Sequence, residues 1–142
     1  MASANKIGDF IVESKKAPNG KTEVVRHKIL SLLGEGAFAK CYKVENEINK
    51  TVFACKVILK KSITLPKYKQ QLMQELKIHR GIRHPNICNF ESFFEDEEKI
   101  YILLEYCPNR TLNEMMRTRR KLHEVEVQYF ALQILKALVY MR

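Results

Sequence analysis

A glycine-containing stretch between two strand-like runs is the feature that most constrains the fold of this chain. Residues 34–41 read GEGAFAKC, with HKILSLLG (27–34) before them and AKCYKVEN (39–46) after them. Glycine lets backbone N–H groups approach a phosphate closely. A dinucleotide-binding fold requires a helix after such a loop, and the Walker loop requires a Gly-Lys-Ser/Thr that is absent here. The stretch is therefore either an ordinary tight turn or a phosphate-binding turn between antiparallel strands.

The next elements continue as a strand and then change period. The run TVFACKVIL (51–59) is apolar on both faces, which is typical of a strand covered on both sides. After Pro66, apolar residues recur at helical spacings. The spacing predicts a helix over about 67–82, ended by Gly81 and then Pro85.

Two strands and two helices are predicted in the remaining sequence. The strands are ICNFESFFE (87–95) and KIYILLEY (99–106), separated by an acidic hairpin tip. Thr111 with Glu114 three residues later forms a capping-box pattern, which predicts a short helix. Residues 123–142 predict a longer helix that is apolar around most of its circumference. Such a helix is normally buried on several sides, and we expect the elements that cover it to be missing from this sequence.

The composition is typical of a globular protein but does not indicate one particular function. The chain has 142 residues, 46% of them hydrophobic, which is enough for one compact domain with a core. Its formal charge of +9 favours anionic partners such as nucleotides, acidic peptides, nucleic acid or membrane. Residues 1–26 lack sustained periodicity, and we expect a flexible basic leader there. No stretch is apolar enough to predict a signal peptide or a membrane span.

The four cysteines, Cys41, Cys55, Cys88 and Cys107, have no CxxC spacing. This argues against a zinc site or a thioredoxin-like site. Since no secretory signal is present, free thiols in a reducing intracellular compartment are expected.

A lysine inside the apolar strand gives the glycine turn a chemical partner. Lys56 lies 20 residues after Gly36, and Glu75 follows on the predicted helix. A buried ammonium needs a partner. We expect Lys56 and Glu75 to form an ion pair that directs the lysine toward nucleotide phosphates.

These motifs together resemble the N-terminal lobe of a eukaryotic protein kinase. The family carries a glycine-rich loop, a V-A-I-K strand and a helix glutamate. The corresponding residues are GEGAFAKC, FACK and the Glu75 of QELKIHRGIRHPNI, and KIYILLEYC resembles the fifth strand running into the hinge. The resemblance implies an α+β fold. A five-stranded antiparallel sheet and one major helix would form an ATP-binding N-lobe at 27–107, and residues 108–142 would begin an incomplete C-lobe.

The resemblance also implies an ATP site and a branch of the family. Leu104 would be the gatekeeper, the backbone of Glu105 and Cys107 would bind adenine, and Leu33, Cys41 and Ala54 would wall the purine pocket. The implied ATP-binding residues are Leu33, Gly34, Glu35, Gly36, Ala37, Phe38, Ala39, Cys41, Ala54, Lys56, Glu75, Leu104, Glu105 and Cys107.

Alanine and cysteine in GAFAKC are similar to polo-like Ser/Thr kinases, as are KIHRGIRHPNI, FFEDEE and LEYC. Glu35 and Pro108-Asn109 replace basic residues usual in that branch.

The catalytic loop H-R-D-x-x-x-x-N and the metal-binding D-F-G follow the long helix in this family. By the resemblance, both lie beyond Arg142. We therefore expect no catalytic base and no metal ligands in this chain. Mg²⁺ is implied for the complete kinase, and ATP would be its substrate. The sequence His79-Arg80-Gly81 is a false match to H-R-D, and we assign His79 to packing and His84 to a helix-ending turn.

Several alternatives remain open. Glu114 either contacts a ribose or serves only the helix cap. The basic run Arg117, Arg119, Arg120 and Lys121 is read as a solvated helix end, with phosphopeptide or nucleic-acid contact as its alternative.

For function, the first hypothesis is the ATP-binding part of a polo-like Ser/Thr kinase, inactive by itself and monomeric or poorly soluble. It would act with ATP and protein substrates and without nucleic acid or membrane. The alternative is a naturally truncated kinase-like protein that binds nucleotide or partners without catalysis. A basic nucleic-acid or membrane module is the third reading. Nucleus, centrosome or spindle is implied by the family alone.

Overall fold

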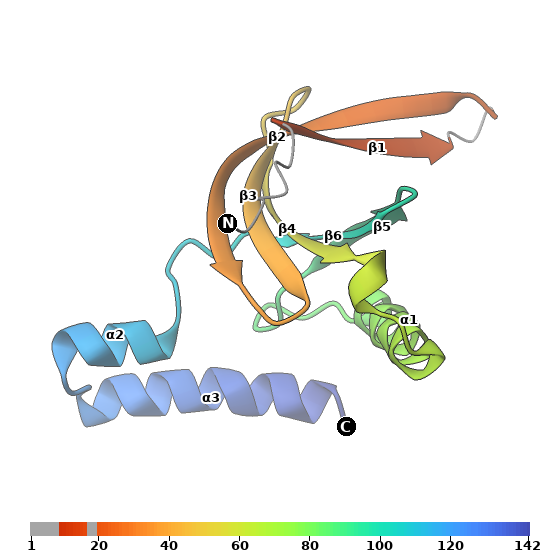
Figure 1. The fold of residues 1–142 in the computed structure, drawn as a ribbon. Coiled ribbons are helices and arrows are strands. Elements are labelled where there is room, and N and C mark those ends of the chain that lie inside the picture. The colour runs from red at the N-terminus through yellow and green to blue at the C-terminus, as the bar shows by residue number, and fades with distance from the viewer. Residues whose placement is uncertain (1–8, 17–19) are drawn as a thin grey trace, which may run out of the picture.

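The computed structural model describes residues 9–16 and 20–142, which build an antiparallel sheet and three α-helices (Figure 1). The six strands occur in the spatial order β1-β2-β3-β4-β6-β5. They are β1 Phe10–Lys16, β2 Thr22–Glu35, β3 Ala39–Asn46, β4 Val52–Leu59, β5 Phe90–Glu95 and β6 Lys99–Glu105. The helices are the short 3₁₀ segment η1 Lys60–Ser62 and the α-helices α1 Pro66–Gly81, α2 Leu112–Arg119 and α3 Glu124–Tyr140.

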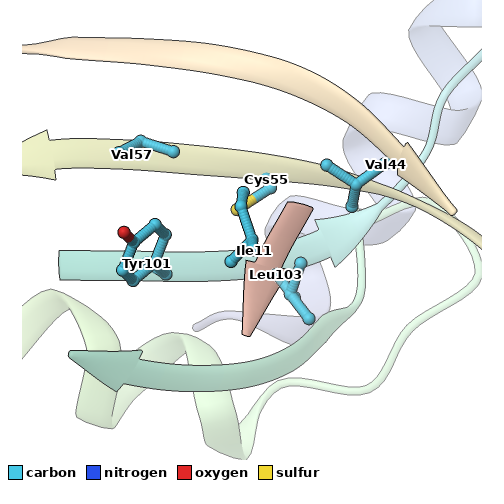
Figure 2. Close-up of a cluster of buried hydrophobic side chains, with 6 residues drawn as sticks. All are labelled: Ile11, Val44, Cys55, Val57, Tyr101 and Leu103. Carbon is cyan, nitrogen blue, oxygen red and sulfur yellow. The ribbon is translucent and has the colours of Figure 1, made fainter. Parts of the chain in front are cut away.

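One face of the sheet carries the larger core. Side chains alternate along a strand, so Cys55 and Val57 of the central strand β4 point to this face. Strand β1 crosses over it, and Ile11 lies against Cys55 and Leu103 in Figure 2. The buried cluster consists of Ile11, Val44, Cys55, Val57, Tyr101 and Leu103.

The opposite face of the sheet packs against α1. This helix begins at Pro66, whose fixed φ suits the first helical position. Its Leu76 is buried against the sheet. The second cluster consists of Ile58, Leu76, Phe90, Ile100 and Ile102. Because β4 supplies residues to both clusters, it is covered on both faces, as its sequence predicts.

The expectation of a flexible leader over residues 1–26 is wrong for the part that the structure describes. Residues 10–16 form β1, and β2 already begins at Thr22. The two strands pair antiparallel from Phe10↔Lys28 to Lys16↔Thr22. The expected five-stranded sheet therefore has a sixth strand. Residues 1–8 and 17–19 lie outside the described residues.

Strand β1 does not show the apolar alternation that predicts a strand, because one of its two buried residues is a glutamate. Ile11 and Glu13 are both buried, and Glu13 Oε2 lies 3.1 Å from Nε2 of the buried His27. A carboxylate–imidazole pair thus takes the place of an apolar contact, so hydrophobic periodicity does not reveal the strand.

The three predicted helices are confirmed. Helix α1 ends one residue before the expected boundary, and α2 and α3 follow the capping-box and apolar patterns. Within the described part of the chain, none of these helices has the length and apolarity of a membrane span.

Candidate functional site

The glycine stretch is the turn of the β2–β3 hairpin. The Gly36 N–H donates to the Ala39 carbonyl oxygen at 2.8 Å and closes the turn. Phe38 at the tip is 63% exposed, and its ring centroid lies 6.5 Å from that of Tyr68 on α1. Next to the turn, Glu35 pairs with Lys40 at 3.2 Å. The acidic residue between the glycines is therefore balanced by a charge of the same hairpin.

Neither glycine of this turn is required by the backbone conformation. Gly34 and Gly36 have no positive φ, whereas Gly20 has φ +78°. A Cβ at Gly34 would meet no atom within 4 Å, and one at Gly36 would meet only the Ala39 oxygen at 3.7 Å. Contacts within the described chain thus leave room for a side chain at both positions. Open backbone of this kind suits close approach by a ligand.

A cavity of about 320 Å³ lies between the hairpin turn, β4 and α1. The turn tip forms one wall, and the helix forms the other. The lining residues are Gly36, Ala37, Phe38, Ala39, Lys56, Ile58, Ser62, Ile63, Tyr68, Gln71, Leu72 and Glu75. Six of the expected ATP-binding residues therefore share this cavity.

The expected ion pair between Lys56 and Glu75 is not formed among the described residues. Both side chains line the cavity, but no contact within 4.0 Å joins their charges. Both residues are exposed, so water can solvate the ammonium and the carboxylate separately, and pairing gains little. The prediction of the pair is wrong for this structure, although the two residues face the same space.

A second cavity, of about 690 Å³, lies at the end of β6. Five expected residues line it: Leu33, Ala54, Leu104, Glu105 and Cys107. Sequence reasoning missed the other lining residues, which are Ser31, Leu32, Cys88, Tyr106, Pro108, Arg110 and Thr111.

Glu114 also lines this cavity and forms the helix cap. The Thr111 hydroxyl accepts a hydrogen bond from the Glu114 N–H at 3.2 Å, and the Glu114 carboxylate accepts from the Thr111 N–H at 3.0 Å. The hydrogen bonds that the Glu114 carboxylate accepts from the Thr111 N–H and from the Thr111 hydroxyl hold the pKa of this carboxyl below its usual value. The carboxylate therefore faces the cavity in its ionised form.

Gly34, Glu35 and Cys41 lie outside both sets of lining residues. Cys41 is half-buried and opposite Lys56 in the β3–β4 register. Burial raises the pKa of the Cys41 thiol, and the Lys56 ammonium opposes this without overcoming it.

Glu105, at the end of β6, forms several hydrogen bonds through its backbone and its carboxylate. Its N–H donates to the Asn89 carbonyl oxygen at 2.9 Å. Its carboxylate accepts hydrogen bonds from the Asn89 N–H and side-chain amide, both at 3.0 Å. Cys88 and Cys107 approach its carbonyl oxygen. Only the pairing of β5 with β6 brings residues 88, 89 and 105 together, so no local motif would have revealed this cluster.

Two of the remaining candidates, His79 and Arg119, have structural roles. His79 Nε2 lies 2.8 Å from the Cys88 carbonyl oxygen, and its ring contacts Phe90, as expected for a packing residue. Arg119 of the basic run holds both carboxylate oxygens of Glu126, at 2.6 and 3.2 Å. This ion pair connects α2 to α3. The interpretation of the basic run as a solvated helix end did not predict this contact.

Comparison with known proteins identifies a family match over most of the chain. Residues 27–142 match the model of the protein kinase domain. A protein named "Probable serine/threonine-protein kinase CCRP1" from Zea mays is 46% identical over 132 residues, which cover 92% of this chain and 21% of the relative. The cell cycle serine/threonine-protein kinase CDC5/MSD2 of Saccharomyces cerevisiae is 43% identical, over 77% of this chain and 15% of its own.

The serine/threonine-protein kinase polo of Drosophila melanogaster is 37% identical over 115 residues, or 81% of this chain and 20% of the relative. The chain thus spans about a fifth or less of the length of these curated relatives.

Proposed function

The chain belongs to the protein kinase family, and on this basis we propose that it is the ATP-binding part of a polo-like serine/threonine kinase. The observation that carries the proposal is the placement of two cavities along β4. Ala54 lines one cavity and Lys56 the other. Residues two apart on a strand point to the same face and are about 7 Å apart, so both cavities open on one face of the sheet. A ligand with an apolar ring at one end and anionic groups at the other matches this layout.

The larger cavity is proposed to hold adenine. Leu33 and Ala54 provide apolar walls, and Leu104 lies at its inner side in the β4–β6 pairing. The backbone of Glu105 and Cys107 would supply polar partners for the base. Ionised Glu114 at the rim is placed to accept a hydrogen bond from a ribose hydroxyl.

The smaller cavity is proposed to hold the phosphates. The Lys56 ammonium supplies a positive charge, and the open backbone at Gly36 lets an anion approach the turn. A bound triphosphate would also place negative charge between Lys56 and Glu75. These residues position the nucleotide and stabilise its charge, which is the larger part of what phosphoryl transfer requires.

The described residues do not offer a magnesium site of the kind that the reaction uses. The lining carboxylates are divided between the two cavities, Glu75 in one and Glu105 and Glu114 in the other. No group of three or more possible ligands from His, Cys, Asp or Glu occurs in residues 9–16 and 20–142. We therefore propose that this chain alone binds nucleotide without transferring phosphate.

Titration of the 142-residue protein with a fluorescent ATP analogue tests the proposal. Replacing Lys56 by Met removes a charge-assisted contact, so the Kd should rise about 10-fold or more. Lys61→Met is the matched control, because Lys61 is exposed and lies outside both cavities. Equal affinities of the wild type and Lys56→Met would contradict the assignment of the phosphate site.

A phosphotransfer assay with radiolabelled ATP tests the second part of the proposal. No incorporation into a protein substrate is expected. Transfer by the purified chain at a rate unaffected by Lys56→Met would contradict both the assignment and its mechanism.

A further inference from the structure

The thiols of Cys88 and Cys107 lie close together, between the larger cavity and a second cavity next to it. Cys88 lies two residues before β5, and Cys107 lies two residues after β6. The strand pairing continues past the strand ends, since Glu105 N–H donates to the Asn89 oxygen. Cys88 Sγ is 3.4 Å and Cys107 Sγ is 4.0 Å from the carbonyl oxygen of Glu105. The two sulfurs therefore lie against the same carbonyl oxygen.

The two thiols differ in exposure and therefore in reactivity. Cys107 is exposed, whereas Cys88 is partly buried. Burial, followed by the neighbouring Cys107 thiol and the Glu105 carboxylate, raises the pKa of Cys88 to about 11. Since the thiolate is the nucleophile, Cys88 reacts slowly by itself near neutral pH. The solvent-facing Cys107 is placed to react first.

The other two cysteines lack this arrangement. Cys55 is fully buried in the core, and burial raises its pKa to about 12. Cys41 and Cys55 lie on neighbouring strands, but Tyr42 is the residue opposite Cys55, so the two side chains point to opposite faces of the sheet.

We propose that Cys88 and Cys107 form an oxidisable dithiol that hydroperoxides convert into an intramolecular disulfide. Both residues line the larger cavity and the adjoining cavity of about 300 Å³ next to α3. The bond would join the segment before β5 to the segment after β6. The two thiols line the cavity proposed to hold adenine, and the Cys107 backbone is one of the contacts proposed there. Disulfide formation uses only the two side-chain sulfurs and requires no bound nucleotide.

The chemistry balances with hydrogen peroxide as the oxidant. The Cys107 thiolate attacks one peroxide oxygen, the O–O bond breaks, and the leaving hydroxide takes a proton to become water. This step leaves a sulfenic acid on Cys107. The Cys88 sulfur then attacks the sulfenic sulfur and displaces hydroxide, which takes the Cys88 proton and leaves as water. In total, two thiols lose two electrons and two protons, and one peroxide is reduced to two waters.

Peptide mapping tests the proposal directly, because trypsin separates all four cysteines. Cys88 falls in peptide 84–99 and Cys107 in peptide 100–110, while Cys41 and Cys55 fall in 41–43 and 51–56. After treatment of the reduced protein with hydrogen peroxide, mass spectrometry should find peptides 84–99 and 100–110 joined, with the loss of two hydrogens. Dithiothreitol should separate them again.

Variants assign the order of the two steps. Cys107→Ser should abolish the joined species and leave Cys88 reduced. Cys88→Ser, or Cys88→Ala as an apolar alternative, should leave a sulfenic acid on Cys107 that dimedone traps. Cys41→Ser is the matched control and should form the joined peptides at the wild-type rate.

Two results would overturn the proposal. One is oxidation of Cys107 to sulfinic acid in the wild type without any joined peptide. The other is a cross-link that forms only between molecules, which a mixture of isotopically heavy and light protein would show as joined heavy and light peptides.

Discussion

The carboxylate of Glu13 is buried at a position where a strand would ordinarily place an apolar side chain. It is 2% exposed, as is its partner His27, and the Lys15 ammonium lies 3.4 Å away. Removing one partner of a buried pair leaves the other without compensation, so Glu13→Ala should cost about 3 kcal/mol of unfolding free energy. Urea denaturation measures this cost. Glu23→Ala on β2, where the residue is exposed, is the control and should change stability by less than about 0.5 kcal/mol.

The same pair makes stability depend on acid pH. Burial on its own raises the pKa of Glu13, but the hydrogen bond with His27 and the Lys15 charge outweigh it, so the pKa lies below its usual 4.5. A lowered folded-state pKa contributes stability that is fully present above the unfolded-state value and is lost as pH falls through the folded-state value. The stability difference between the wild type and Glu13→Gln should therefore shrink as the pH is lowered from about 5 through the folded-state pKa of Glu13. A difference that stays constant over this range would show that the carboxylate charge is not involved.

The glycines of the hairpin turn differ from Gly20 in a way that mutation can separate. Because Gly36 has no positive φ and open space for a Cβ, Gly36→Ala should change unfolding free energy by less than about 0.5 kcal/mol. If the turn binds phosphate, the added methyl group should raise the Kd for an ATP analogue at least about fivefold. Gly20→Ala is the converse control: its φ of +78° makes a side chain strained, so it should destabilise the fold by about 1 kcal/mol without changing the Kd. Loss of stability in Gly36→Ala would instead indicate that the turn needs glycine for folding.

At the level of elements, hydrophobic period and capping chemistry were sufficient for most of the fold. The strands from residue 27 onward, α1 and α3 were predictable from their apolar patterns, whereas α2, which buries no residue, was predictable from its capping box. Strand β1 was not, since the buried Glu13 breaks the pattern that marks a strand. The polar partner that makes this burial tolerable is His27, 14 residues away on β2, and a single local window cannot show such a pairing.

The sequence predicted part of the lining of the two cavities but not the contacts within them. That these residues bind ATP stays a prediction. The family resemblance brought Gly36, Lys56 and Glu75 to one cavity, because the order of strands and α1 fixes where their backbones lie. Whether the two charges touch depends on side-chain solvation, and the sequence does not encode it in a pattern. Likewise, Cys88 and Asn89 reach the end of β6 only through the register of β5 against β6.

The capping box of α2 is an element whose local stability can be measured by hydrogen exchange. Thr111→Ala removes the acceptor for the Glu114 N–H, at a cost of about 1 kcal/mol. Amide exchange at Glu114 should therefore accelerate about fivefold. Thr118→Ala is the control, because that hydroxyl only donates back to the Glu114 carbonyl oxygen and such bonds add little to a helix. Unchanged exchange in Thr111→Ala would mean that tertiary contacts, not the cap, hold the first turn.

At the scale of the whole molecule, the sheet with α1 is packed on both faces, whereas α3 is joined to the rest mainly through polar contacts. Tyr140 accepts a hydrogen bond from the Arg83 N–H, and Gln133 accepts one from the Asn86 side chain. Ala137 is the buried residue of this helix. The exposed large apolar residues at and next to α3 are Val125, Val127, Tyr129, Leu132, Ile134, Leu135, Leu138, Val139, Tyr140 and Met141.

This many exposed apolar side chains on one helix make α3 an association surface. Sedimentation velocity over a roughly hundredfold concentration range should show the mean mass rising above that of a 16.7 kDa monomer. Replacing Leu135 and Val139 by Lys should keep the protein monomeric, since both side chains are more than half exposed and the folded core is untouched.

The control variant places the same two charges at exposed positions of α3 that do not carry large apolar side chains, as Gln128→Lys with Ala131→Lys. It should associate like the wild type, because added charge alone does not remove the apolar area. A wild-type protein that stays monomeric at the highest concentration would contradict the prediction, and equal suppression by both double variants would assign the association to net charge instead.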